Sequence, residues 1–373
     1  MDFHFPQKIR LGQGVSQHVG LAAKEGGSRT LLLTESSFDS SKELTILTQS
    51  LERAGVAFIV LSKGTEQSSS SFLSEAATLG RASRAESIMV LGGNTLLSWG
   101  RALAIEISKG QKDSNGKKST AGLPYIEVPT STCFPLLLRE EAFLDSMHPS
   151  ELRFINTPLF HKHRIFLDPH MVTGITAVTS VTGLLETLFF AVEAYYSELS
   201  GLTEQSLLLG AIGAIWSNLE KIYKNPAAIE HRWITFQAGW NVALALALIP
   251  RNVGLTLTLV LGGLIGLPAT ALGSLFLAPF LEVYGPKSVE RTQRLAQVMG
   301  AGGWDGAVES LGPKLAQDVR KFLNVYQLPL RLTDYQAVEA QTVLAADVVQ
   351  GLNVGNGGLL PAKDLPEFLQ FVT

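Results

Sequence analysis

The sequence predicts an α/β domain with a parallel sheet, followed by an all-α domain. Between positions 30 and 129, short apolar runs alternate with amphipathic stretches, which is the rhythm of strands and helices in a doubly wound sheet. After Asp168 this pattern gives way to long helical stretches, and no further run of strands returns. We therefore expect one domain over residues 1–170 and a second, helical domain over residues 171–373.

In the first domain, the strands are the short apolar runs and the helices are the amphipathic stretches between them. Strands are expected at 30–34, 56–61, 87–93 and 125–129, with a last strand ending in "FLDPHM". Helices are expected at 42–55, near 72–82 and through Ile107. The polar segment 108–120 carries several lysines and is interpreted as a solvated surface loop.

The uncharged stretch 253–281 raises the question of whether the chain spans a membrane. It contains no Asp, Glu, Lys, Arg or His, and its length suffices for a span. Glycines and the prolines Pro268 and Pro279 break it into pieces, however, and no segment of comparable length could join it in a bundle. We therefore interpret it as buried sequence of the helical domain and expect no membrane partner. The expected helices are 175–199, 203–223, 226–248, 255–281, 287–300, 303–325 and 333–348.

Composition narrows the class of function. The chain has 373 residues, of which 46% are hydrophobic and 17% charged, and its formal net charge is −3. It has no basic excess to neutralise a phosphate backbone, so we expect a small-molecule substrate and no nucleic acid. Cys133 is the only cysteine, which excludes an intrachain disulfide and any multi-cysteine metal site. The N-terminus shows no signal-peptide pattern, and we expect a cytoplasmic protein.

The stretch "SIMVLGGNTLLSWG" carries the clearest chemical signal. It reads as a strand, a glycine pair and a helix that opens with Asn94 or Thr95 as its cap. Glycines at such a turn let the backbone approach a pyrophosphate, and the helix N-terminus offers free N–H groups to the anion. A tight turn without a ligand is the alternative. Glu35 ends the strand "LLLTE" and could accept hydrogen bonds from a ribose hydroxyl, unless it serves only to start the next helix.

In their order along the chain, these pieces resemble the iron-containing alcohol dehydrogenase family, especially its glycerol-dehydrogenase-like branch, whose architecture dehydroquinate synthases share. The resemblance rests on "FPQKIRLGQGV", "LGGNT", "VPTSTCFP", "RIFLDPHMV", "TGLLETLFFAVEAYYS" and "GLTLTLVLGGLIGLPATALGSLFLAP". It implies a Rossmann-like first domain, an NAD or NADP cofactor, alcohol–carbonyl oxidoreduction and a homo-oligomer.

By this resemblance, the cofactor is held by residues from several loops of the first domain. They are Gly92, Gly93, Asn94 and Thr95 at the pyrophosphate, Thr130 and Ser131 along the adenosine, and Arg153, where the family has a cofactor-facing lysine.

The family's metal site is the feature that this sequence lacks. Family members hold a divalent metal with one Asp and two or three His, and the metal polarises the substrate oxygen. The family pattern places Leu255, Leu259 and Ala269 (or Thr270) at histidine positions and Glu186 at the aspartate position. No histidine follows His231, and one carboxylate does not make a tight site for a catalytic cation. We therefore expect no bound metal.

Without a metal, Glu186 becomes the candidate general acid or base, because its apolar neighbours would desolvate it. A structural pair with an arginine such as Arg139 or Arg251 is the alternative. The apolar substrate pocket would be lined by Phe189, Phe190, Leu255, Leu259 and Ala269. Three functions follow: a metal-independent NAD(P)-dependent oxidoreductase, a non-redox cyclase or lyase, or a non-catalytic binding protein.

Overall fold

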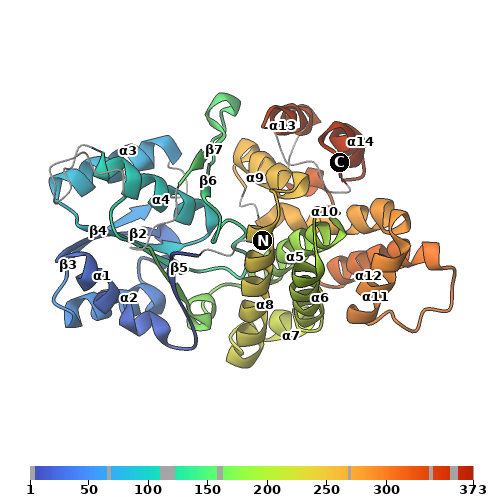
Figure 1. The fold of residues 1–373 in the computed structure, drawn as a ribbon, viewed down its shortest axis with the longest axis horizontal. Coiled ribbons are helices and arrows are strands. Elements are labelled where there is room, and N and C mark those ends of the chain that lie inside the picture. Colours follow the sequence, from blue (N-terminus) through green and yellow to red (C-terminus); the bar gives the residue numbers. More distant parts are fainter. Residues whose placement is uncertain are drawn as a thin grey trace. The chain divides into compact units, whose positions relative to one another are not determined.

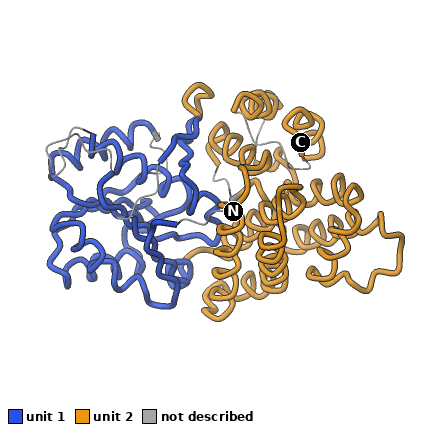
Figure 2. Tube along the Cα trace, viewed as in Figure 1, with its two compact units in different colours: residues 1–146, 153–174 blue, residues 147–152, 175–373 orange. Residues whose placement is uncertain are grey.

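The computed structural model describes residues 5–64, 69–109, 122–157, 163–267, 270–335, 339–352 and 360–372. The chain divides into two compact units (Figure 2). The first comprises residues 1–146 and 153–174, and the second comprises residues 147–152 and 175–373. The chain therefore enters the second unit briefly at 147–152 and passes into it finally after Gly174.

The first unit is built on a six-stranded sheet in which each strand is parallel to its neighbours. The strand order is β1-β8-β5-β4-β2-β3. The strands span Lys8–Leu11 (β1), Arg29–Glu35 (β2), Ala57–Lys63 (β3), Ser87–Gly92 (β4), Tyr125–Pro129 (β5) and His163–Leu167 (β8). The helices around them span Val19–Gly26 (α1), Lys42–Arg53 (α2), Ser69–Ala82 (α3) and Asn94–Ser108 (α4). The predicted fold class, a parallel α/β domain followed by a helical domain, is confirmed (Figure 1).

The central strands are rich in buried apolar residues because helices cover both faces of the sheet. Leu31 and Leu33 of β2 belong to the core on the side of α3 and α4, whereas Leu32 belongs to the core on the side of α1 and α2. Strand β4 alternates in the same way. Figure 1 shows the two helix pairs on opposite sides of the strands.

Asp168 ties the end of β8 to the loop that follows β1. Its carboxylate accepts hydrogen bonds from the N–H groups of Gly14 (3.1 Å), Ser16 (3.0 Å) and His170 (3.0 Å). Gly14 has a φ of 75°, a left-handed conformation that favours glycine at this turn. The buried aspartate thus holds three backbone donors in place of water.

A second, two-stranded sheet was not predicted. Strands β6 (Glu141–Leu144) and β7 (Arg153–Asn156) pair antiparallel. Each has four residues, too few for a period-2 alternation to be distinguished in the sequence.

The second unit is helical. Its α-helices in the described residues span Ala177–Tyr196 (α5), Leu202–Trp216 (α6), Leu219–Lys224 (α7), Ile229–Leu248 (α8), Val253–Ile265 (α9), Thr270–Tyr284 (α10), Val289–Val298 (α11), Leu311–Val325 (α12), Glu339–Gly351 (α13) and Leu365–Gln370 (α14).

Several helices differ from expectation. The single helix expected at 203–223 is two helices, α6 and α7, and the helix expected at 333–348 is Glu339–Gly351 (α13). The stretch 255–281 is not one helix, because α9 ends at Gly266, whose φ of 69° breaks the helical path. Pro279 does not interrupt α10, which continues through it while packed along α5 and α12. The helix expected from residue 303 begins at Leu311, since Gly303 and its neighbouring glycines disfavour helix.

Helix α5 is the centre of the helical unit and packs against α6, α7, α8, α9 and α10. It is long and apolar enough to cross a membrane by length and composition, but 83% of that window is buried inside the protein. Helix α9, which begins the uncharged stretch, is buried from Val253 to Leu264. Both helices therefore form the core of this unit.

A glycine allows α10 to lie close to α5. A Cβ added at Gly273 of α10 would lie 2.5 Å from the Cα of Glu186 on α5, closer than real atoms approach. We expect Gly273→Ala to force these helices apart and lower the free energy of unfolding by about 2 kcal/mol, despite alanine's better helix propensity.

The matched control is Gly210→Ala on α6, where an added Cβ meets no atom within 4 Å. This change should raise the free energy of unfolding by about 0.5–1 kcal/mol. Urea unfolding followed by circular dichroism measures both. Equal stability of the two variants would contradict the close α5–α10 contact.

Candidate functional site

The glycine turn lies between β4 and α4, as predicted. Gly92 ends the strand, and Gly93, with φ −82° and ψ −178°, is the N-cap of α4. Asn94 and Thr95 occupy the first helical turn, so the expectation that one of them would cap the helix was wrong. The helix starts one residue earlier because Gly93 already has the extended backbone of a cap.

Glu35 lies against this turn. Strands β2 and β4 are neighbours, so their carboxyl ends lie side by side. The Glu35 Oε1 accepts a hydrogen bond from the N–H of Gly93 at 3.1 Å. The Glu35 carboxylate thus occupies the Gly93 N–H, the donor expected to bind a phosphate at the start of α4.

Thr130 and Ser131 follow β5 on the other side of the turn. The N–H of Thr130 donates to the carbonyl oxygen of Gly92 at 3.0 Å, and the Ser131 Oγ accepts from the N–H of Cys133 at 3.0 Å. Thr130 is buried and Ser131 is half-buried. The structure therefore brings Thr130 and Glu35 to the same glycine turn, one from each neighbouring strand.

Arg153, the remaining predicted cofactor residue, does not lie on the strand ends that carry Glu35 and Thr130. It is the exposed first residue of β7, opposite Leu144, and so belongs to the two-stranded sheet rather than to the parallel sheet.

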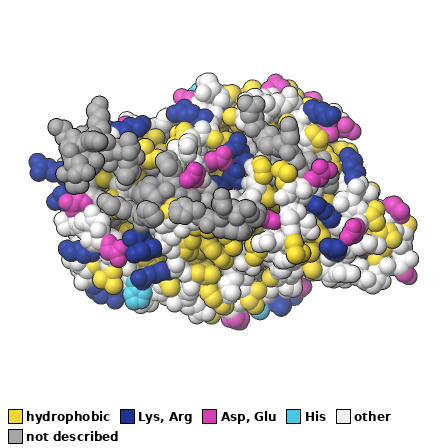
Figure 3. Space-filling model, in the orientation of Figure 1, with side chains coloured by type: hydrophobic (Ala, Val, Ile, Leu, Met, Phe, Trp, Pro, Cys, Tyr) yellow, Lys and Arg dark blue, Asp and Glu magenta, His cyan; other side chains and the backbone are white. Residues whose placement is uncertain are grey.

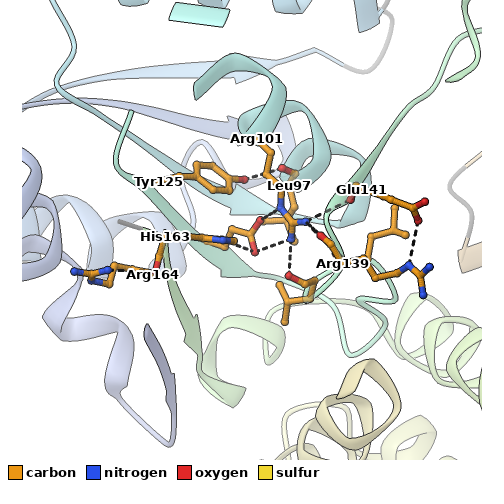
Figure 4. Close-up of polar contacts among 10 residues, drawn as sticks. Leu97, Arg101, Tyr125, Arg139, Glu141, His163 and Arg164 are labelled. Atoms are coloured by element: carbon orange, nitrogen blue, oxygen red, sulfur yellow. Dashed lines mark hydrogen bonds and ion pairs between the residues drawn. The ribbon is translucent and has the colours of Figure 1, made fainter. Parts of the chain in front are cut away.

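A buried ionic network that joins α4, β5 and β8 was not predicted (Figure 4). Arg101 of α4 binds Glu127 of β5 through two contacts, Nε–Oε1 at 2.6 Å and Nη2–Oε2 at 3.2 Å. His163 Nε2 lies 3.3 Å from the same carboxylate, and its ring stacks on Tyr125 with centroids 5.1 Å apart. The remaining Arg101 donors bind the carbonyl oxygens of Leu136, Leu137, Arg139 and Glu141.

The contacts among Arg101, Glu127 and His163 shift the pKa values of Glu127 and His163. Burial by itself raises the pKa of Glu127, but the Arg101 guanidinium and His163 outweigh it and hold that pKa at about 2. Burial lowers the pKa of His163, although Glu127 acts against it. The sequence signal was one charged residue inside each of two apolar elements, "LLSWGRALAI" and "YIEVP".

The predicted catalytic and pocket residues lie in the interior of the helical unit. Glu186 is fully buried on α5, and the side chains of Phe189 and Phe190 are buried next to it on the same helix. Phe189 packs on Phe276 and Phe280 of α10 with ring centroids 5.7 and 5.9 Å apart. On α9, the side chains of Leu255 and Leu259 are also buried. Ala269 lies outside the described residues.

These residues do not fit a divalent cation. Leu255 and Leu259 lie one turn apart on α9 and offer no donor atom. Within the described ranges, no three His, Cys, Asp or Glu side chains come together in an arrangement that could hold a metal ion.

Glu193, also on α5, caps helix α9. Its carboxylate accepts hydrogen bonds from the N–H groups of Gly254 (2.6 Å) and Leu255 (3.2 Å). Burial raises the pKa of Glu193 to about 7, although both N–H groups act to lower it. Glu193 therefore joins α5 to the start of α9.

Comparison with known proteins gives a consistent result. The family model of the iron-containing alcohol dehydrogenases matches residues 6–135 of the sequence. The family model of their C-terminal domain matches residues 180–357. A search of curated proteins found no match.

Solved structures of similar fold include a 1,3-propanediol oxidoreductase, with 16% identity, a TM-score of 0.84 and coverage of 100% of this chain and 99% of that one. The NADH-dependent butanol dehydrogenase A of Thermotoga maritima has 18% identity, a TM-score of 0.83 and coverage of 100% and 98%. The alcohol dehydrogenase of Oenococcus oeni has 20% identity, a TM-score of 0.84 and full coverage of both chains.

The raised pKa of Glu193 predicts a pH-dependent stability. A carboxyl whose folded pKa exceeds its unfolded value stabilises the fold below the unfolded pKa, and this stabilisation is lost as pH rises through the folded pKa. The window therefore runs from the ordinary value of 4.5 to about 7.

We expect the stability advantage of the wild type over Glu193→Gln to fall between about pH 4.5 and pH 8 by on the order of 3 kcal/mol, because glutamine does not titrate. Urea unfolding of both proteins across this range measures it. A difference that stays constant with pH would contradict the assignment.

Proposed function

The chain belongs to the iron-containing alcohol dehydrogenase family, and on that premise we propose that it is an NAD(P)-dependent oxidoreductase that works without the family's metal. Its reaction would interconvert an alcohol and a carbonyl compound. The observation that carries the proposal is the convergence of Glu35, the Gly93 N–H and Thr130 at adjoining strand ends. This is where a doubly wound sheet binds dinucleotides.

Cofactor binding depends on the start of α4. The Gly93 N–H binds the Glu35 carboxylate, and a phosphate would take this donor as Glu35 turns to the ribose. Asn94 and Thr95 are half-buried in the same first turn and flank that position. When bound, the nicotinamide would accept or supply the hydride.

The proton is the second requirement of the reaction. When an alcohol is oxidised, the carbinol carbon loses a hydride and the hydroxyl loses a proton. In the family the metal assists the proton loss, but the residues of this chain do not fit a metal, so we assign the proton to Glu186 or to an ordered water. Glu186 is surrounded by apolar side chains of the helical unit.

We infer that the substrate is apolar. Phe189, Phe190, Leu255 and Leu259 offer no hydrogen bonds, and each unmatched substrate hydroxyl would cost about 1–3 kcal/mol. An apolar substrate instead gains about 25 cal/mol for each Å² of apolar surface that it buries.

A role without a dinucleotide is the second candidate: a non-redox cyclase or lyase, or a non-catalytic binding protein. The Glu35–Gly93 contact favours it, because a carboxylate at the phosphate donor must be displaced before a dinucleotide binds.

Titration of the purified protein with NADH and NADPH, followed by fluorescence, separates these candidates. We expect Gly93→Val to weaken binding at least about ten-fold, because a branched side chain would block the phosphate. The fold should persist, since a Cβ at Gly93 meets Glu35 Oε1 at 3.6 Å, an ordinary contact. Gly210→Ala is the control. Unchanged affinity of Gly93→Val, or a wild type that binds neither nucleotide at millimolar concentration, contradicts the redox proposal.

Metal independence has its own test. Elemental analysis of the purified protein should find no stoichiometric Zn, Fe or Ni, and added Zn or Fe should leave cofactor affinity unchanged. Leu259→His alone should not create metal-dependent activity, because one histidine and one carboxylate do not complete a catalytic site. About one metal per chain, lost in Glu186→Ala, would contradict this part of the proposal.

A further inference from the structure

The loop after β5 is held at both ends by a single side chain. At its start, Arg101 pairs with Glu127, three positions before Thr130. At its end, the same guanidinium binds the carbonyl oxygens of Leu136 and Leu137 at 3.0 and 2.7 Å. The segment between these anchors, which contains Thr130 and Ser131, therefore takes its position from Arg101.

Helix α4 relates this loop to the glycine turn. The helix begins at the turn, with Gly93 as its N-cap, and carries Arg101 about two turns later. The N–H of Thr130 donates to the carbonyl oxygen of Gly92, so the loop after β5 is also bonded directly to the glycine turn. A rigid helix thus fixes the distance between the two parts of the proposed cofactor site.

Arginine is suited to this task in a way that lysine is not. Its planar guanidinium presents five N–H donors, and here they bind both carboxylate oxygens of Glu127, three loop carbonyls and the carbonyl of Glu141 at the start of β6, with Nη1 sharing its two donors among three acceptors. A lysine ammonium has three donors on one atom and cannot span the same acceptors. In Figure 4 the loop carbonyls point toward the guanidinium.

We propose that Arg101 is a positioning residue for the dinucleotide, which holds the loop of Thr130 and Ser131 at the spacing from the glycine turn that the cofactor needs. The inference rests on the proposed function, since it assigns a role in binding the same cofactor. It extends that function by naming the buried side chain on which the geometry of the site depends.

The test compares two variants of Arg101. Arg101→Lys keeps a positive charge beside Glu127 but loses most of the loop bonds. The double variant Arg101→Met, Glu127→Gln removes both buried charges together, so no uncompensated charge remains, and the amide oxygen introduced by Glu127→Gln can still accept a bond from His163. Arg81→Lys is the control, because Arg81 pairs with Glu106 on the surface of the same unit.

For Arg101→Lys we expect a Kd for NADH weakened at least about ten-fold and faster amide hydrogen exchange in residues 136–141. For the double variant we expect a melting temperature close to that of the wild type while the affinity remains weakened. Arg81→Lys should match the wild type in both measurements.

Two results would overturn the inference. One is a wild-type Kd for NADH in Arg101→Lys. The other is a double variant in which the NADH affinity recovers together with the melting temperature, as a merely structural role of Arg101 requires. A wild type that binds neither NADH nor NADPH would instead overturn the proposed function itself. The two failures are therefore distinguished by which protein shows them.

Discussion

Four carboxylates that leave water wholly or in part are met by N–H donors, and these contacts tie together elements in both units of this protein. Asp168 binds three backbone donors, Glu193 the start of α9, Glu35 the cap of α4 and Glu127 the guanidinium of Arg101. In each case the carboxylate joins elements that are distant in the sequence. These four carboxylates thus act as fixed points between which the apolar core packs. On the face drawn in Figure 3, positively and negatively charged side chains are mixed over the surface.

The parallel sheet was predictable because burial on both faces demands continuous apolar strands, and "TLLLT" and "SIMVLGG" are such runs. The approach of Glu35 to the glycine turn was predictable as well, since the carboxyl ends of parallel strands meet at one edge. The Arg101–Glu127 pair was not, because nothing local in a sequence specifies which buried charge faces which. Helix ends such as Gly266, and the four-residue strands β6 and β7, likewise depend on tertiary packing that no short window contains.

The interior of the helical unit is apolar around α5, α9 and α10. The comparisons place this chain among iron-containing alcohol dehydrogenases, yet α9 offers Leu255 and Leu259 to its neighbours, and Phe189 packs among aromatic rings of α10. Glycines at 254 and 273 let α9 and α10 approach α5 so closely that an added Cβ would meet side-chain or backbone atoms at 2.5–2.6 Å. Burial in this apolar interior accounts for the absence of charged residues from the stretch 253–281.

The bonds of Arg101 also bear on the order in which the chain folds. Its partners lie 26 to 40 positions away in the sequence, so each bond requires that a chain segment of that length has already closed. Helix α4 is a local structure that can form without the loop, whereas strand β4 needs its distant partners β2 and β5, and the loop carbonyls meet their donor after β5 has joined the sheet. Segment 136–141 is therefore expected to order late in folding. A nascent chain that ends before this segment already carries Glu127 but not the four carbonyl acceptors of Arg101, so these bonds form only after the residues of β2, β3, β4 and β5 have been synthesised.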